Sequence, residues 1–173
     1  MRYLIILSIA LLSIASCRNG ADEAFSFTHE TQFNVPSGLD NILTHIFVIE
    51  NLPSTFEAAA AQNGLTADQI ISVTSSTGEF IGRFESNDYS NILRVAVNLV
   101  DPTGEFDTRE IYFQENIPLN HNGPLQLFGT LSDVKDLIAQ PTHNLEIELT
   151  FKSPTSLTLE NRFIYNFVAF DNE

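Results

Sequence analysis

The alternation of apolar and polar residues from Phe25 onward has the period of two that is typical of half-buried β-strands. In residues 25–35, the apolar side chains Phe25, Phe27, Phe33 and Val35 share one face, and polar residues take the other face. The same alternation, with turn residues between the segments, predicts seven further strands. They lie at residues 42–52, 69–73, 91–100, 108–117, 123–131, 144–152 and 157–170.

Two of these strands carry more specific predictions. Residues 42–52 are apolar on both faces around Ile46–Ile49, which favours a central strand covered on both sides. In residues 91–100, one face is predicted to carry Leu93, Val95, Val97 and Leu99.

Two short helices interrupt the alternation. Ser54 and Glu57 have the spacing of a capping box, and Asn63-Gly64 supplies a stop after an alanine run. A second helix is expected within residues 131–141, with Ser132 as its N-cap. Eight strands at hairpin spacing with short helices at the crossings predict an all-β fold. We expect an immunoglobulin-like two-sheet antiparallel β-sandwich with one or two short crossover helices.

The first segment of the chain has a different pattern. The basic start Met1–Tyr3 is followed by eleven uncharged residues, Leu4–Ile14, and then by small residues, as in a secretory signal peptide. The apolar run is shorter than the roughly 20 residues of a membrane-spanning helix. Residues 14–17, IASC, resemble the lipobox of bacterial lipoproteins, with Ile14 where leucine is commonest and Ser16 where glycine or alanine is commonest.

The lipobox resemblance implies a specific modification of Cys17. In that family the cysteine sulfur receives a diacylglyceryl group, the signal is cut before the cysteine, and the new amino terminus is acylated. The expected organisation is therefore a signal peptide at residues 1–16, a lipidated Cys17 with a flexible tether at residues 17–24, and a β-sandwich domain at residues 25–173. The alternative is an ordinary secreted protein in which Cys17, the only cysteine, is incidental.

Composition narrows the classes of partner. Of the eight Lys and Arg residues only Arg2 lies in the predicted leader, so seven basic residues face 22 acidic ones in the remainder. This charge disfavours nucleic acid, whose phosphates would be repelled, and also an anionic lipid surface. The predicted domain of residues 25–173 holds no cysteine, so burial alone must stabilise it.

Candidate chemistry is sparse. The four histidines are scattered without zinc-site spacing, and we expect them at edges or in loops: His29, His45, His121 and His143. Glu146 and Glu148 share a strand face, which is typical of solvated acids. No catalytic residue, cofactor or metal ligand is therefore predicted, although calcium at residues 85–91 or 101–107 stays an open alternative. Among the tyrosines, Tyr89 is the best candidate for an exposed sugar platform.

These observations favour a non-enzymatic envelope lipoprotein. The chain also resembles, in general pattern, small uncharacterised β-sandwich lipoproteins of the Bacteroidota. We expect it at a bacterial cell envelope, anchored to the outer membrane through acylated Cys17, on the periplasmic or the surface-exposed side. A possible partner is an envelope protein or a glycan. Two alternatives are a carbohydrate-binding module for polysaccharide capture and a small hydrolase with an unrecognised carboxylate site.

Overall fold

The computed structural model describes residues 21–83 and 88–172. Three short helical elements occur between its strands: α2 (Phe56–Gln62), the 3₁₀ turn η1 (Ala67–Gln69) and α3 (Lys135–Ile138). The strands are β1 (Asp22–Val35), β2 (His45–Pro53), β3 (Ile70–Gly82), β4 (Ile92–Val100), β5 (Arg109–Glu115), β6 (Leu125–Gly129), β7 (Thr142–Phe151) and β8 (Leu159–Asp171). The predicted all-β class with short helices is confirmed.

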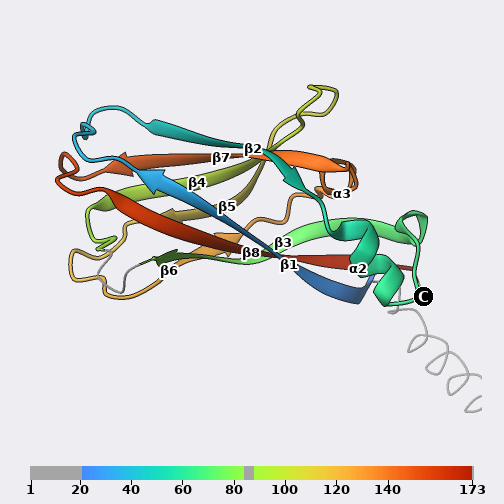
Figure 1. Ribbon diagram of the computed structural model, residues 1–173. Coiled ribbons are helices and arrows are strands. Elements are labelled where there is room, and N and C mark those ends of the chain that lie inside the picture. The colour runs from blue at the N-terminus through green and yellow to red at the C-terminus, as the bar shows by residue number, and fades with distance from the viewer. Residues whose placement is uncertain (1–20, 84–87, 173) are drawn as a thin grey trace, which may run out of the picture.

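Hydrogen bonding joins the eight strands in one antiparallel sheet, in the order β1-β8-β3-β6-β5-β4-β7-β2. The sheet curls, so that β2, β4 and β7 lie over β1, β3 and β8 (Figure 1). Its two edge strands come close where the ring of Phe33 in β1 lies 6.3 Å from that of Phe47 in β2. The pairing of β5 with β6 is short, with only two residue pairs in register.

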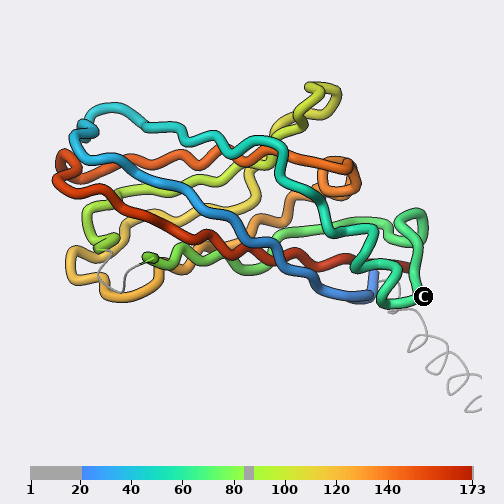
Figure 2. The backbone as a smooth tube through the Cα atoms, viewed as in Figure 1, coloured from blue at the N-terminus to red at the C-terminus, as the bar shows by residue number. Residues whose placement is uncertain are grey.

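The core fills the inside of the curl. Alternate residues of the strands point inward, as the strand period requires, and pack as one apolar cluster. Helix α2 packs against this cluster near the start of β1 (Figure 2), where the ring of Phe56 lies 6.3 Å from Phe25 and 5.8 Å from Phe27. Strand β7 behaves as predicted, with Leu145, Ile147, Leu149 and Phe151 buried.

Strand β2 corrects the prediction of a central strand at residues 42–52. It pairs only with β7 and forms an edge of the sheet. Its outward side chains Ile46 and Val48 are 57% and 53% exposed. An apolar run on both faces is thus produced here by an edge strand whose outer face meets solvent. Leu93 in β4 also differs from prediction and is exposed, because the register with β7 shifts between Ile92 and Arg94.

The helix starts differ from the predicted caps. Ser54 Oγ accepts the N–H of Phe56 at 3.2 Å, and no capping box with Glu57 forms at the start of α2. At α3, the carboxylate of Asp133 accepts the first helical N–H at 3.0 Å, in the role expected for Ser132. A carboxylate is a stronger hydrogen-bond acceptor than a serine hydroxyl at the positively polarised start of a helix. Asp133 also accepts the N–H of Val73 in β3.

Strand β1 begins at Asp22, so residues 22–24 of the predicted tether belong to the sheet. The pairing of Glu23 with Phe170 extends the strand to this point. The predicted signal peptide and Cys17 lie outside the described residues. In the part of the chain that is described, none of the helices has the length and apolar character needed to span a bilayer.

Candidate functional site

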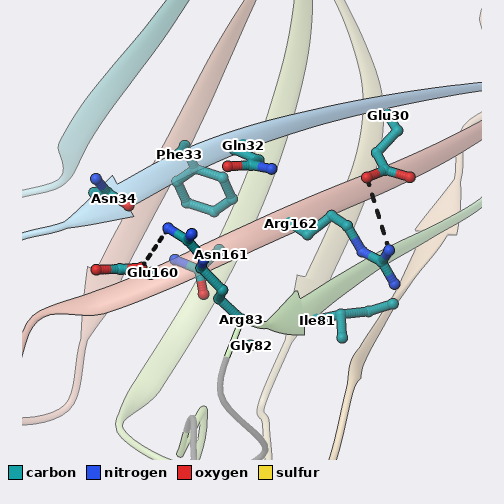
Figure 3. Close-up of a pocket in the computed structure, with 10 residues that line it drawn as sticks. All are labelled: Glu30, Gln32, Phe33, Asn34, Ile81, Gly82, Arg83, Glu160, Asn161 and Arg162. Carbon is teal, nitrogen blue, oxygen red and sulfur yellow. Dashed lines mark hydrogen bonds and ion pairs between the residues drawn. The ribbon is translucent and has the colours of Figure 1, made fainter.

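A polar groove lies over β1, β8 and the end of β3 (Figure 3). Its volume is about 510 Å³. Charged and amide side chains supply most of its lining, together with Phe33, Ile81 and the backbone at Gly82. The polar lining residues are Glu30, Gln32, Asn34, Arg83, Glu160, Asn161 and Arg162.

The strand period and the register place these side chains together. Glu30, Gln32 and Asn34 are alternate residues of β1, so they share its outer face. Gln32 stands opposite Arg162 of β8, and Asn34 stands opposite Glu160. The groove therefore depends on two antiparallel strands from opposite ends of the chain.

Two ion pairs cross the groove between strands. Arg83 Nη1 lies 3.1 Å from Glu160 Oε2, and Arg162 Nη1 lies 3.7 Å from Glu30 Oε1 (Figure 3). The four side chains are between 39% and 66% exposed. Exposed pairs of this kind contribute only about 0–1 kcal/mol each, so their partners can exchange for a ligand at low cost.

The other described lysines and arginines form contacts outside the groove. Arg109 forms a bidentate pair with Asp136, with both contacts at 2.6 Å. Lys135 and Lys152 donate to main-chain carbonyl oxygens, and Arg94 lies between two glutamates. Arg83 and Arg162 are the remaining two of the six described Lys and Arg residues, and both line the groove.

A second cluster corrects the prediction for two histidines. His29 and His143 were expected at edges or in loops, but their side chains are buried, at 7% and 0% exposure. Their rings meet edge to face, with centroids 5.4 Å apart, and His29 stacks on Tyr165 at 5.2 Å. Burial lowers the pKa of His29 to about 4, and burial together with the nearby His29 lowers the pKa of His143 to about 3. Both imidazoles are therefore neutral at pH 7.

Hydrogen bonds orient this pair only in part. His143 Nε2 lies 3.2 Å from the hydroxyl of Tyr165, and His29 Nε2 lies 3.3 Å from Thr55 Oγ1. The buried Nδ1 atom of His143 has no hydrogen-bond partner among the described residues. The same part of the chain contains no group of three His, Cys, Asp or Glu side chains arranged to hold a metal ion.

The remaining candidates take structural positions. Tyr89 is buried and donates a 2.9 Å hydrogen bond to Asn161, so the prediction of an exposed sugar platform is wrong. In the loop at residues 101–107, the carboxylate of Asp101 accepts hydrogen bonds from Thr103 and from two later backbone N–H groups. These bonds lower the pKa of Asp101 and use its oxygens inside the loop.

The predicted acidic face also forms. Glu146 and Glu148 lie on the outer side of β7, half-buried, and Glu148 accepts a 2.9 Å bond from Asn98 of the neighbouring β4. The groove residues Arg83 and Arg162 are not among the residues predicted from the sequence. The available signal was the scarcity of basic residues, but only the register of β1, β3 and β8 shows that these two meet.

No protein-family model and no curated protein sequence matches the chain. Among solved structures, the chain is similar to one in the capsid asymmetric unit of cyanophage Pam1, with 11% identity and a TM-score of 0.44, over 89% of this chain and 94% of that chain. It is also similar to VP2 of infectious bursal disease virus in a subviral particle, with 13% identity and a TM-score of 0.41, over 87% of this chain and 38% of that one. These similarities leave the function to be inferred from the chain's own residues.

Proposed function

We propose that the protein is a bacterial envelope lipoprotein whose β-domain has a non-enzymatic binding role. The observation that carries the anchor is the order of elements before Cys17: a basic residue, eleven uncharged residues and the IASC motif. A single acyl chain gives only marginal membrane binding, whereas the two or three chains of a lipoprotein cysteine hold firmly. Outer-membrane attachment through Cys17 is part of this proposal.

The anchor is tested by Cys17→Ala in the full chain expressed in a lipoprotein-processing bacterium. We expect the wild type to stay with membranes through an alkaline wash and the variant to move to the soluble fraction. Mass spectrometry of the wild-type amino terminus should find an acylated cysteine at residue 17. Arg18→Ala is the matched control and should stay with membranes. Membrane retention of the Cys17→Ala variant, or an unmodified thiol, would contradict the anchor.

We also infer that the curled sheet is a two-layer sandwich. The order β1-β8-β3-β6 and the order β5-β4-β7-β2 describe two four-stranded halves that only two residue pairs join. This division and the eight strands are typical of a jelly roll rather than of the immunoglobulin-like topology expected from the sequence. Such a body offers broad outer sheet faces, and the groove lies on one of them.

Carbohydrate binding is the second candidate function, and an exposed aromatic pair favours it. Phe113 in β5 and Phe128 in β6 are 37% and 60% exposed, with ring centroids 6.0 Å apart. The polar side chain of Gln126 occupies the same outer face of β6 as Phe128. Exposed rings beside polar groups are a common surface for sugars, which present both C–H and O–H groups.

A hydrolase remains the third hypothesis, and the groove offers it less support. The glutamates Glu30 and Glu160 each lie beside an arginine, and their side chains are 50% and 39% exposed to solvent. A general acid needs the opposite environment, one that keeps its proton at neutral pH. Clear turnover in a broad hydrolase screen would nevertheless replace the binding proposal by this one.

A further inference from the structure

We propose that the groove over β1, β3 and β8 binds a neutral glycan through adjacent hydroxyl groups. This inference rests on the proposed binding role and names its ligand class and its residues. The residues that carry it are Arg83, Arg162, Glu30 and Glu160, with the amides of Gln32 and Asn34 between them.

The chemistry of the lining matches hydroxyl groups. A sugar hydroxyl both donates and accepts, so two adjacent hydroxyls fit a site that presents a donor beside an acceptor. Each interstrand ion pair is such a site, because its guanidinium donates and its carboxylate accepts. Gln32 and Asn34 add both functions within one amide group each. Charge-assisted bonds of this type are stronger than neutral ones.

The charge balance of the groove favours a neutral ligand. Two arginines and two glutamates cancel, whereas the whole chain has a formal net charge of −14. An anionic ligand would meet Glu30 and Glu160 in the groove and a negative field around it. A cationic ligand would meet Arg83 and Arg162 at close range. A neutral polyol avoids both costs.

The polar lining residues form rows across the two facing strands. Glu160 and Arg162 are two residues apart on β8, as are Asn34 and Gln32 on the facing β1. Residues two apart on a strand are separated by about 7 Å, and both point to the same face. Successive polar rows thus lie about 7 Å apart on one outer face. The half-buried Ile81 adds an apolar contact for sugar C–H groups.

Native affinity electrophoresis of the full chain in detergent tests the proposal. The gels contain the neutral polysaccharides xyloglucan, galactomannan or starch, with polygalacturonate and hyaluronan as acidic comparisons. We expect at least one neutral polysaccharide to retard the protein. Arg162→Ala should weaken that retardation about tenfold or more, because it removes a charge-assisted donor. Asn34→Ala, a milder change at an exposed site, should weaken it about threefold or more.

Arg94→Ala is the matched control. Arg94 also lies between glutamates on an outer sheet face, but it belongs to β4 and not to the groove. We expect its retardation to equal that of the wild type. The proposal is overturned if no neutral polysaccharide retards the protein, if the groove variants bind as the wild type does, or if only the acidic polysaccharides bind. None of these results bears on the Cys17 anchor, which the fractionation experiment tests separately.

Discussion

His29 and His143 bring two imidazole rings into a core that is otherwise built mainly from Phe, Leu, Ile and Val. They belong to β1 and β7, which are not neighbours in the sheet, so they meet across the inside of the curl. At neutral pH the neutral rings pack as aromatic groups against Tyr165. Their effect on stability therefore depends on whether a proton is added.

We predict that acid destabilises the fold through this pair. The folded-state pKa values, about 4 for His29 and about 3 for His143, lie below the ordinary value of 6.5. Between these values the unfolded chain binds more protons than the folded one, so the free energy of unfolding falls as the pH drops below about 6.5. Chemical denaturation at pH 7 and at pH 4.5 measures the loss. His143→Phe should reduce the loss by about half.

The control for this experiment is Phe27→Leu, which truncates a ring packed against His29 without removing a titratable group. It should lower the free energy of unfolding at both pH values and leave the difference between them unchanged. An equal acid loss in the wild type and the His143→Phe variant would show that other groups cause it.

Gly129 lies where the backbone leaves no room for a side chain. A Cβ added there would lie 2.5 Å from the carbonyl oxygen of Ser75 and also clash with that of Ser76, so backbone would have to move. We predict that Gly129→Ala lowers the free energy of unfolding by about 1–3 kcal/mol in urea titrations. Gln126→Ala, at an exposed position of the same strand, should change it by less than about 0.5 kcal/mol. A neutral Gly129→Ala variant would contradict this account.

At the scale of elements, β2 is an exposed edge with apolar outward side chains. Edges of this kind invite pairing with other strands, and a lysine on the edge prevents it. We predict that Ile46→Lys changes the free energy of unfolding by less than about 0.5 kcal/mol and reduces self-association in light scattering at high concentration. Its neighbour Phe47 points inward to Phe33, so Phe47→Lys should cost about 2–4 kcal/mol.

The test compares the destabilisation caused by lysine at position 46 with that caused by lysine at position 47. Equal destabilisation by the two lysines would mean that β2 is covered on both faces, as the sequence analysis expected. Unchanged light scattering with Ile46→Lys would mean that this edge does not pair in solution.

The strands differ in how far sequence could predict them. Strands β1 and β7 alternate cleanly, because each has one face in the core and one in solvent. Strand β2 could not be placed, since apolar residues on both faces describe a central strand and an exposed edge equally well. The shift that exposes Leu93 depends on pairing with β7, which is about fifty residues away in the chain. The groove and the histidine pair could not be predicted from the sequence for the same reason, because each joins strands that are distant in the chain.

At the scale of the whole molecule, the first and last strands of the described residues, β1 and β8, are neighbours. Strand β1 pairs with β8 from Asp22 to Val35, and α2 covers the core near the start of β1. The groove lies toward the other end of the same two strands, around residues 30–34. With about 3.3 Å per residue, about 30 Å of β1 separates Glu23 from Gln32. Under the proposed function, the start of β1 and a ligand in the groove would therefore lie at opposite ends of one pair of strands.

If the protein is anchored and binds a polymer as proposed, the pairing of β1 with β8 would bear the load between the two. Tension between an anchor before Asp22 of β1 and a polymer held by Arg162 of the facing β8 would run along the strand axis. In that direction the interstrand hydrogen bonds are sheared and resist together, whereas a sideways pull would peel them one after another. Under the proposed function, a tethered domain arranged in this way would hold a long, moving polymer without losing the pairing of its first strand.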